Sequence, residues 1–165
     1  MNLCFRLFVV TGILMMSGWL TGCKSLLPAT RIVNEDINSF KYFYITPTNE
    51  LTSSTGATIS GQYYSSTKTI NPGDVISGRL TKAGFIRIPE LKKEDLQDDT
   101  FIVNYGESGT RKTGFGGYAI EVNIQFISAR STSIVCSCTA EGQGSTEADD
   151  IRQAITRCLD ELIAR

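Results

Sequence analysis

The sequence contains no histidine, and this absence narrows the chemistry that the chain can perform. Histidine is the usual general base near neutral pH, the usual partner of a serine or cysteine nucleophile, and the commonest zinc ligand. An enzyme without histidine depends on paired carboxylates, on lysine or on a thiol of low pKa, and the sequence shows no motif of that kind. We therefore expect a non-enzymatic protein with no catalytic residues, no metal and no cofactor.

The sequence also has no cluster of basic residues, and its 16 Lys and Arg residues are balanced by 17 Asp and Glu residues. A nucleic-acid-binding domain typically carries a basic patch, so we expect no nucleic-acid partner. The acidic run at residues 90–100 lacks the central Gly and closing Glu of a calcium-binding EF-hand loop. Residues 106–117 resemble a phosphate-binding loop, but Arg111 stands where that loop requires Gly before its Lys-Thr pair. We expect both segments to be surface connectors.

The chain lacks an apolar run long enough to cross a bilayer. The longest, residues 7–20, has 14 residues, whereas a spanning helix needs about 20. It follows the positively charged Arg6 and ends in the motif LTGC at residues 20–23. This order is typical of a secretory signal, and the motif resembles the box cut by lipoprotein signal peptidase. The pattern predicts a signal peptide over residues 1–22, with Cys23 as the lipidated first residue of the mature chain.

The predicted lipid fixes the location of the protein. Residues 23–39 are expected to form a lipidated tether, and residues 40–165 a single domain large enough to bury a core. Lys24, not Asp, follows the cysteine. By resemblance to enterobacterial sorting, this favours the outer membrane, and we expect the domain to face the periplasm.

Aromatic and β-branched residues predict a strand at residues 40–46, and alternating apolar positions predict strands at residues 118–128 and 132–140. Shorter strands are expected at residues 85–88 and 101–105. Capping signals and apolar stripes predict two helices, at residues 71–83 and 146–164. Gly78 lies within the first helix, where it costs about 1 kcal/mol, and we expect it to permit close packing on the sheet. The result is an α+β two-layer sandwich, with a mostly antiparallel sheet of four or five strands and two helices on one face. The predicted element order is β-α-β-β-β-β-α.

Two polar segments are candidate binding regions. Residues 49–69 are rich in Ser, Thr and Gly, and form either a mobile crossover or a loop around a short extra strand. Within them, Tyr63 and Tyr64 provide either an exposed aromatic edge or a partly buried anchor. Residues 106–117 are expected to form a long hairpin loop, to which Arg111 and Lys112 give a positive tip.

Three cysteines of the predicted domain fall on surfaces that should meet. Cys136 and Cys138 lie on one face of a strand, because strand side chains repeat every two residues. Cys158 lies on the apolar stripe of the last helix. A disulfide from Cys158 to either Cys136 or Cys138 is therefore reasonable in an oxidising compartment. The alternative is three buried, reduced thiols.

The order of these segments resembles that of small bacterial envelope lipoproteins of uncharacterised function. In outline it is also similar to the lipoprotein that plugs the lipopolysaccharide-transport translocon. The segments that carry the resemblance are IVNEDINSFKYFYI, LTKAGF, DDTFIVNY, GYAIEVNIQFISARSTSIVCSCTAEGQG and TEADDIRQAITRCLDELI. The resemblance implies the α+β fold and brings no catalytic residues.

Three functions follow as hypotheses. The first is a membrane-anchored envelope lipoprotein that assists assembly of an outer-membrane complex and has an envelope protein as partner. The second is a periplasmic or surface module that binds a glycan or small ligand through Tyr63, Tyr64 and the 106–117 loop. The third is an enzyme that uses carboxylates or Cys136 and Cys138. A deep pocket would favour the second, and a flat apolar patch on the sheet face away from the helices would favour the first.

Overall fold

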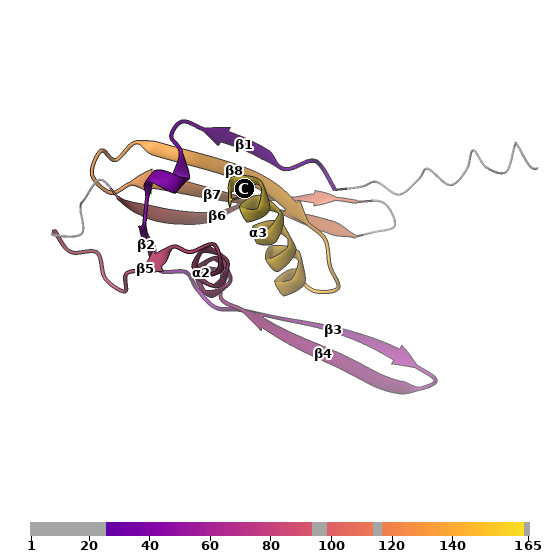
Figure 1. Cartoon of the computed structure of the whole chain (residues 1–165). Coiled ribbons are helices and arrows are strands. Elements are labelled where there is room, and N and C mark those ends of the chain that lie inside the picture. The colour runs from indigo at the N-terminus through magenta and orange to yellow at the C-terminus, as the bar shows by residue number, and fades with distance from the viewer. Residues whose placement is uncertain (1–25, 94–98, 114–116, 164–165) are drawn as a thin grey trace, which may run out of the picture.

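The computed structural model describes residues 26–93, 99–113 and 117–163. These residues form a six-stranded mixed sheet with two α-helices on one face, and a separate two-stranded ribbon (Figure 1). The strands are β1 (Thr30–Val33), β2 (Tyr42–Ile45), β3 (Leu51–Ile59), β4 (Gln62–Ile70), β5 (Ile86–Arg87), β6 (Thr100–Lys112), β7 (Tyr118–Ser128) and β8 (Ile134–Gly142). The helices are α2 (Pro72–Lys82) and α3 (Glu147–Ile163), with a 3-10 turn at Ile37–Ser39. The chain therefore has an α+β fold. No helix in these ranges is long and apolar enough to span a membrane.

The main sheet is larger than predicted, and its strands follow the order β1-β8-β7-β6-β2-β5. Its centre is antiparallel, but β2 pairs in parallel with both β5 and β6. The prediction of four or five mostly antiparallel strands was thus wrong in detail. The difference arises because α2 carries the chain back to the start of β2, so that β5 runs beside it in the same direction.

The sheet also begins earlier in the chain than the sequence indicates. Residues 30–33, expected in the tether, form β1 and pair antiparallel with β8. This strand adds an edge of only four residues, and the opposite edge strand, β5, has two. Four exposed residues without an apolar alternation give no strand signal, so only the pairing with β8 reveals β1.

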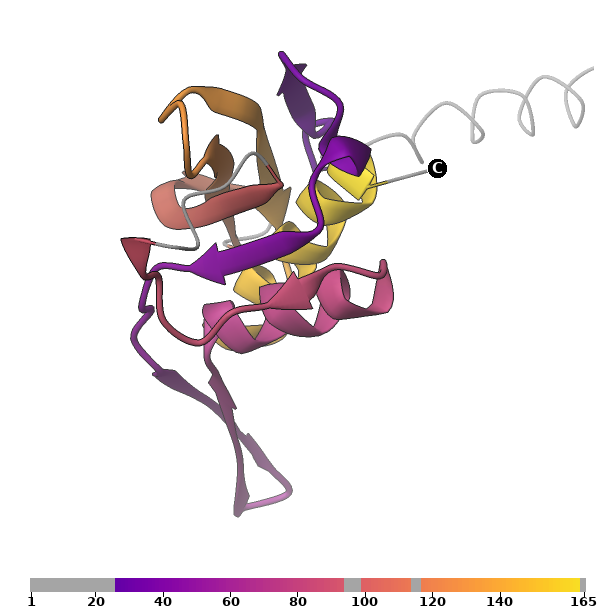
Figure 2. The ribbon, with the colours of Figure 1, turned by 60° about the vertical axis from the view of Figure 1, so that its left-hand side comes forward.

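Strands β3 and β4 form a β-hairpin, which we call the arm. The arm extends away from the sheet and helices (Figures 1 and 2). Ser60 and Gly61 connect the strands with φ angles of 51° and 80°, which are typical of a type I′ turn. The sequence predicted either a mobile crossover or a loop around one short strand here, whereas the structure has two strands of nine residues. Both faces of the ribbon are polar, so no alternation marks the strands.

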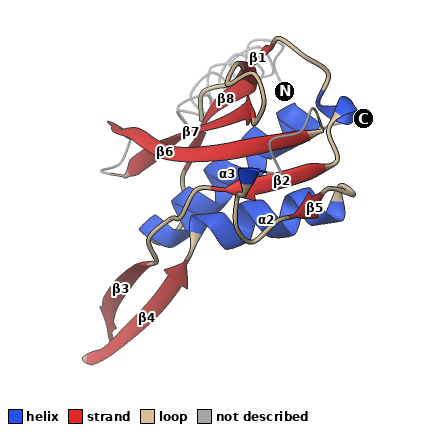
Figure 3. Cartoon of the chain, turned by 90° about the vertical axis from the view of Figure 1, so that its left-hand side faces the viewer, coloured by secondary structure: helices blue, strands red, loops and turns tan. Residues whose placement is uncertain are grey.

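The core lies between the sheet and the two helices, which contact each other on the same side of the sheet (Figure 3). Phe101 is its centre: its ring packs against the rings of four other phenylalanines, which are Phe40, Phe43, Phe85 and Phe126. Helix α3 covers β7 and β8 with an apolar face that is fully buried at Ile151, Ile155 and Leu159.

Local signals place both helices within a residue or two of the predicted bounds. The side chain of Asn71 caps α2 by accepting a hydrogen bond from the Gly73 N–H at 3.0 Å. Gly84, with φ at 101°, ends it. The expected role of Gly78 was wrong: a Cβ there would have open space around it, so this glycine permits no close approach. The close contact is at Gly142 of β8, where a Cβ would collide with the backbone of α3.

Candidate functional site

An ion pair with a buried carboxylate lies where the chain enters the domain. The Glu141 side chain, at the end of β8, is only 4% exposed. Arg111 donates to its two carboxylate oxygens from Nε and Nη2, at 2.6 and 2.7 Å. The Leu27 N–H donates to the same carboxylate at 2.9 Å. The Arg111 guanidinium, helped by this N–H, holds the pKa of Glu141 below its usual range, and the pair raises the pKa of Arg111.

Arg157 of α3 completes this arrangement. Its Nη2 donates to the Leu27 carbonyl at 2.6 Å, and its Nη1 donates to the carbonyl of Glu141. We call Arg111, Glu141 and Arg157 the N-terminal clamp, because together they bind both backbone polar groups of Leu27. Cys23 lies outside the described residues, but it is four residues before Leu27 and thus within about 14 Å of it along the chain.

The clamp changes the expected role of Arg111. The sequence places Arg111 and Lys112 on a positive loop tip, whereas β6 continues to Lys112 and Arg111 is neutralised by Glu141. Lys112 is exposed. Sequence reasoning missed the pair because Glu141 lies 30 residues further along the chain. Only the register of β6, β7 and β8 brings the two side chains together.

The other two candidate residues, Tyr63 and Tyr64, lie near the end of the arm. Tyr63 is 71% exposed and Tyr64 is 56% exposed. As neighbours in a strand they project from opposite faces. The Tyr63 ring covers Gly56 on the paired strand, where a Cβ would collide with it. Tyr63 and Tyr64 lie on the arm, whereas Arg111 and Lys112 lie at the end of β6, so the four candidate residues come from two separate hairpins.

The base of the arm is fixed to the start of α3. Lys68 Nζ lies 2.7 Å from Asp149 Oδ2, and this contact, together with hydrogen bonds from Ser145 and Thr146, lowers the pKa of Asp149 to about 2. The Ala148 N–H donates to Ser53 Oγ at 3.0 Å. A hollow of about 380 Å³ lies beside this base, lined by Thr55, Tyr118 and residues 143–147 among others. The arm is therefore attached at its base, while its outer part is exposed on both faces.

The sheet face away from the helices carries an apolar row. The row crosses four neighbouring strands at directly opposed positions, which are Tyr44, Ile102, Ile127 and Ile134. Ile134 is 41% exposed, and Ile86 beside Tyr42 on the same face is 46% exposed. The adjacent row on the same face of the sheet consists of uncharged polar residues: Asn104, Gln125 and Ser137. No helix of the described ranges packs on this face, because α2 and α3 both lie on the other (Figure 3). The surface is thus flat, largely uncharged and partly apolar.

The cysteines form one of the two bridges that the sequence allows. Cys138 of β8 and Cys158 of α3 are joined by a disulfide, with their Cα atoms 5.6 Å apart. Cys136 is reduced and buried, and burial raises the pKa of its thiol to about 12. A thiol with this pKa is almost entirely protonated at neutral pH, so Cys136 is a poor nucleophile.

The described residues show no cluster of side chains that could hold a metal ion. No three Cys, Asp or Glu side chains of residues 26–93, 99–113 and 117–163 gather as a metal site requires. Asp150 is buried, and burial raises the pKa of its carboxyl, but its oxygen accepts the Gly144 N–H and it thus serves the start of α3. Another hollow of about 250 Å³, beside β1 and the end of α3, is smaller than typical ligand pockets of 300–1,000 Å³.

Comparison with known proteins identifies a structural likeness. No protein-family model matches the chain, and no curated protein matches it in sequence. Among solved structures, it is similar to the PelC dodecamer from Paraburkholderia phytofirmans, with a TM-score of 0.51 and 16% identity over 83% of this chain and 97% of that chain. A second crystal form, of a single-substitution PelC variant, gives a TM-score of 0.50 with the same identity and coverage. At this identity, the likeness shows that the chain shares the fold of PelC.

Proposed function

We propose that the chain is a non-enzymatic, lipid-anchored envelope protein that serves as a subunit or accessory factor of an outer-membrane complex. The observation that carries this proposal is the apolar row on the open sheet face. A soluble monomer rarely leaves a contiguous apolar patch uncovered unless it binds a partner. The row is flat and bordered by uncharged polar residues, which suits a protein surface better than a small ligand.

Three further observations support the proposal. The LTGC motif and the apolar run before it indicate lipidation at Cys23. The N-terminal clamp gives the predicted tether a fixed exit from the domain. The disulfide between Cys138 and Cys158 suits an oxidising compartment such as the periplasm.

The fold likeness suggests which partner to test first. The similar PelC chains are dodecamers, so this fold is compatible with a protein that packs against copies of itself. We therefore propose that a second copy of this chain covers the apolar row, and that a different envelope protein is the alternative partner. The short edge strands β1 and β5 leave little backbone for strand addition, which favours contact through the face.

The test is site-specific photo-cross-linking in the intact membrane. A photoreactive amino acid replaces Ile134 in the row, and a matched variant carries it at Thr81, an exposed residue of α2 on the helical side. We expect position 134 to give one discrete cross-linked product and position 81 to give none. Cys23→Ala, which removes the predicted anchor, should abolish the product.

The size of the purified protein provides the second readout. Light scattering in detergent should give a multiple of the protomer mass for the wild type and a smaller mass for Ile134→Asp, with circular dichroism unchanged. A monomeric wild type without a product at position 134 would contradict the proposal. Ligand screening of the hollows beside the arm and β1 would then take precedence.

A further inference from the structure

The three most exposed tyrosines of the described residues lie at the ends of two hairpins. Tyr63 and Tyr64 lie near the tip of the arm, beside Ile59, which is 61% exposed. Tyr118 begins β7, at the far end of the long β6–β7 hairpin, and is 56% exposed. The remaining tyrosines in these ranges, Tyr42, Tyr44 and Tyr105, are half-buried. Exposed aromatic surface is thus concentrated at these two ends.

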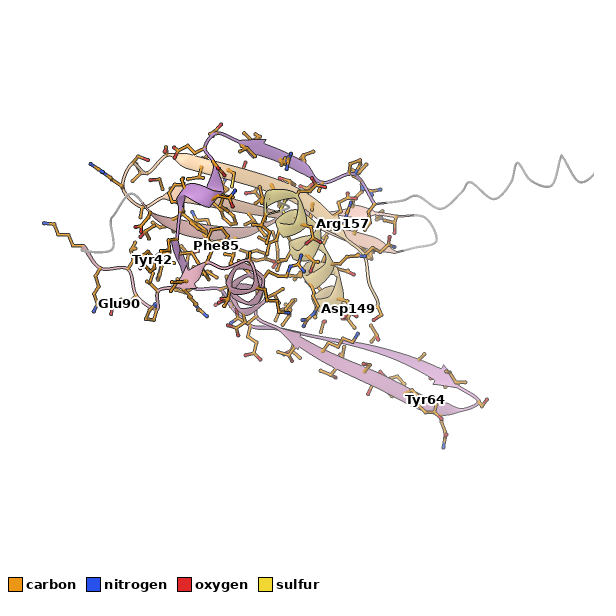
Figure 4. All side chains as sticks on the ribbon, viewed as in Figure 1. Tyr42, Tyr64, Phe85, Glu90, Asp149 and Arg157 are labelled. Atoms are coloured by element: carbon orange, nitrogen blue, oxygen red, sulfur yellow. A yellow bond between two sulfur atoms is a disulfide. The ribbon has the colours of Figure 1, made fainter. Side chains whose placement is uncertain are left out.

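Both ends point to the side on which the N-terminal segment leaves the domain. In Figure 1 the arm, the end of the β6–β7 hairpin and the described residues before β1, residues 26–29, all lie to the right. Figure 4 shows Tyr64 on this side, whereas Tyr42 and Glu90 lie on the opposite side. The start of the described chain, from which only a short segment leads to Cys23, and the exposed tyrosines therefore share one side of the molecule.

The length of chain before the clamp limits how far the membrane can lie from this side. Leu27 is fixed to Arg157 and Glu141, and only three residues separate it from Cys23. Extended chain spans at most about 3.6 Å per residue, so the lipidated residue lies within about 14 Å of Leu27. A strand of nine residues is about 30 Å long, and the arm can therefore cover a comparable or greater distance on the same side.

The composition of the arm suits a lipid interface. Between Glu50 and Asp74 the only charged residue is Lys68, and Lys68 pairs with Asp149 at the base. The tip consequently brings no unpaired charge to the bilayer. Tyrosine is favoured at the boundary of a membrane, because its ring is apolar while its hydroxyl remains hydrated.

We propose that Tyr63, Tyr64 and Ile59 of the arm, together with Tyr118, rest in the headgroup region of the membrane that holds the lipid on Cys23. This inference rests on the proposed lipid anchor. The arm and the anchor then form two separate attachments, and two attachments fix the orientation of the domain as well as its distance from the bilayer.

The absence of tryptophan from the predicted mature chain permits a direct test. The only tryptophan of the sequence is Trp19, which precedes the predicted cleavage at Cys23. Tyr64→Trp therefore introduces a unique fluorescent reporter at the arm tip, and Tyr42→Trp provides the matched control on the opposite side. Each full-length variant is expressed, purified from membranes and reconstituted into phosphatidylethanolamine–phosphatidylglycerol vesicles, with or without brominated acyl chains as quenchers.

We expect bromine to remove at least half of the emission of Tyr64→Trp and to leave that of Tyr42→Trp unchanged. Equal quenching of both reporters, or none of Tyr64→Trp, would overturn the inference. A blue-shifted Tyr64→Trp spectrum without bromine quenching would also overturn it, because a protein partner would then cover the tip.

The anchor itself is checked on the same samples. Intact mass must show the acyl groups, and the wild type must show no tryptophan emission once residues 1–22 are removed. Retained Trp19 emission or an unmodified mass would contradict the proposed anchor, whereas an unquenched Tyr64→Trp in fully acylated protein contradicts the membrane position of the arm alone.

Discussion

Arg111 binds both carboxylate oxygens of Glu141, and this pair joins the end of β6 to the end of β8 across the intervening β7. The same carboxylate accepts the N–H of Leu27. One buried charge thus connects the sheet to the segment that leads to the predicted lipid. Removing Arg111 would leave the buried Glu141 carboxylate without its counter-charge, which costs far more than the loss of an exposed pair.

We expect Glu141→Gln to lower the melting temperature and to release the segment around Leu27. The amide keeps the shape of the side chain but removes the charge that Arg111 pairs with. Thermal unfolding measures the first effect, and hydrogen exchange at Leu27 measures the second. Glu90→Gln, on an exposed connector far from the clamp, is the matched control. Unchanged exchange at Leu27 would show that the clamp does not hold the segment.

The same pair predicts a dependence of stability on pH. The pKa of Glu141 is lowered by folding, so its stabilising contribution is fully present above the unfolded value of about 4.3. That contribution disappears as the pH falls through the lower folded value. The free energy of unfolding of the wild type should therefore fall more steeply below pH 4 than that of Glu141→Gln. If the free energies of unfolding of the two proteins, measured by urea titration, changed with pH in parallel, this role for Glu141 would be ruled out.

The disulfide and the free thiol predict a count of reactive cysteines. In the mature lipidated protein, unfolded without reductant, a maleimide should label only Cys136; after reduction it should also label Cys138 and Cys158. In the folded protein Cys136 should resist labelling, because it is buried and its pKa is raised to about 12. Mass spectrometry counts the labels, and rapid labelling of folded protein would contradict this burial.

Cys158→Ser should destabilise the domain by about 3 kcal/mol, since the bridge closes a loop of 20 residues. Chemical unfolding under non-reducing conditions measures the loss. Cys136→Ala, at a buried reduced thiol two residues from the bridge, is the comparison and should cost less. Equal losses would assign the effect to packing of the helix on the sheet, not to the covalent link.

Two glycines should respond to alanine in opposite directions. Gly78 lies inside α2 with open space around it, so Gly78→Ala should stabilise the protein by about 1 kcal/mol. Gly142→Ala should destabilise it, because the new Cβ would collide with the backbone of α3 at Asp150. Urea unfolding of both variants provides the measurement. A neutral Gly142→Ala would show that α3 can shift away from the sheet without cost.

The sequence predicted the elements whose signals are local. The alternation at Ile120, Val122 and Ile124 identified β7, and the apolar stripe of residues 146–164 identified α3, because each element buries a single face. The predicted hairpin of β7 and β8 is present. Periodicity is informative wherever one side of an element faces the core.

Features that depend on distant residues could not be predicted. The arm has no core to face, so its strands show no alternation, and Tyr63 and Tyr64 gave no indication that they lie on a projecting ribbon. Nothing in the sequence around Arg111 indicated that it pairs with Glu141, which lies 30 residues further along the chain. The open face was visible in the sequence only as polar alternation in β7. Its apolar row became apparent once the register aligned Ile102 with Ile127.

The attachment of the arm has a mechanical consequence. Because the arm is held near its base by Lys68 and Ser53, it behaves as a lever whose free end is about 20 Å away, six residues further along each strand. A rotation of about ten degrees at the base moves the tip by about 3.5 Å, which is comparable to the rise per residue of a strand. Small rearrangements at the start of α3 are therefore amplified at Tyr63 and Tyr64, and a displacement of the tip is transmitted to the helix that covers the sheet.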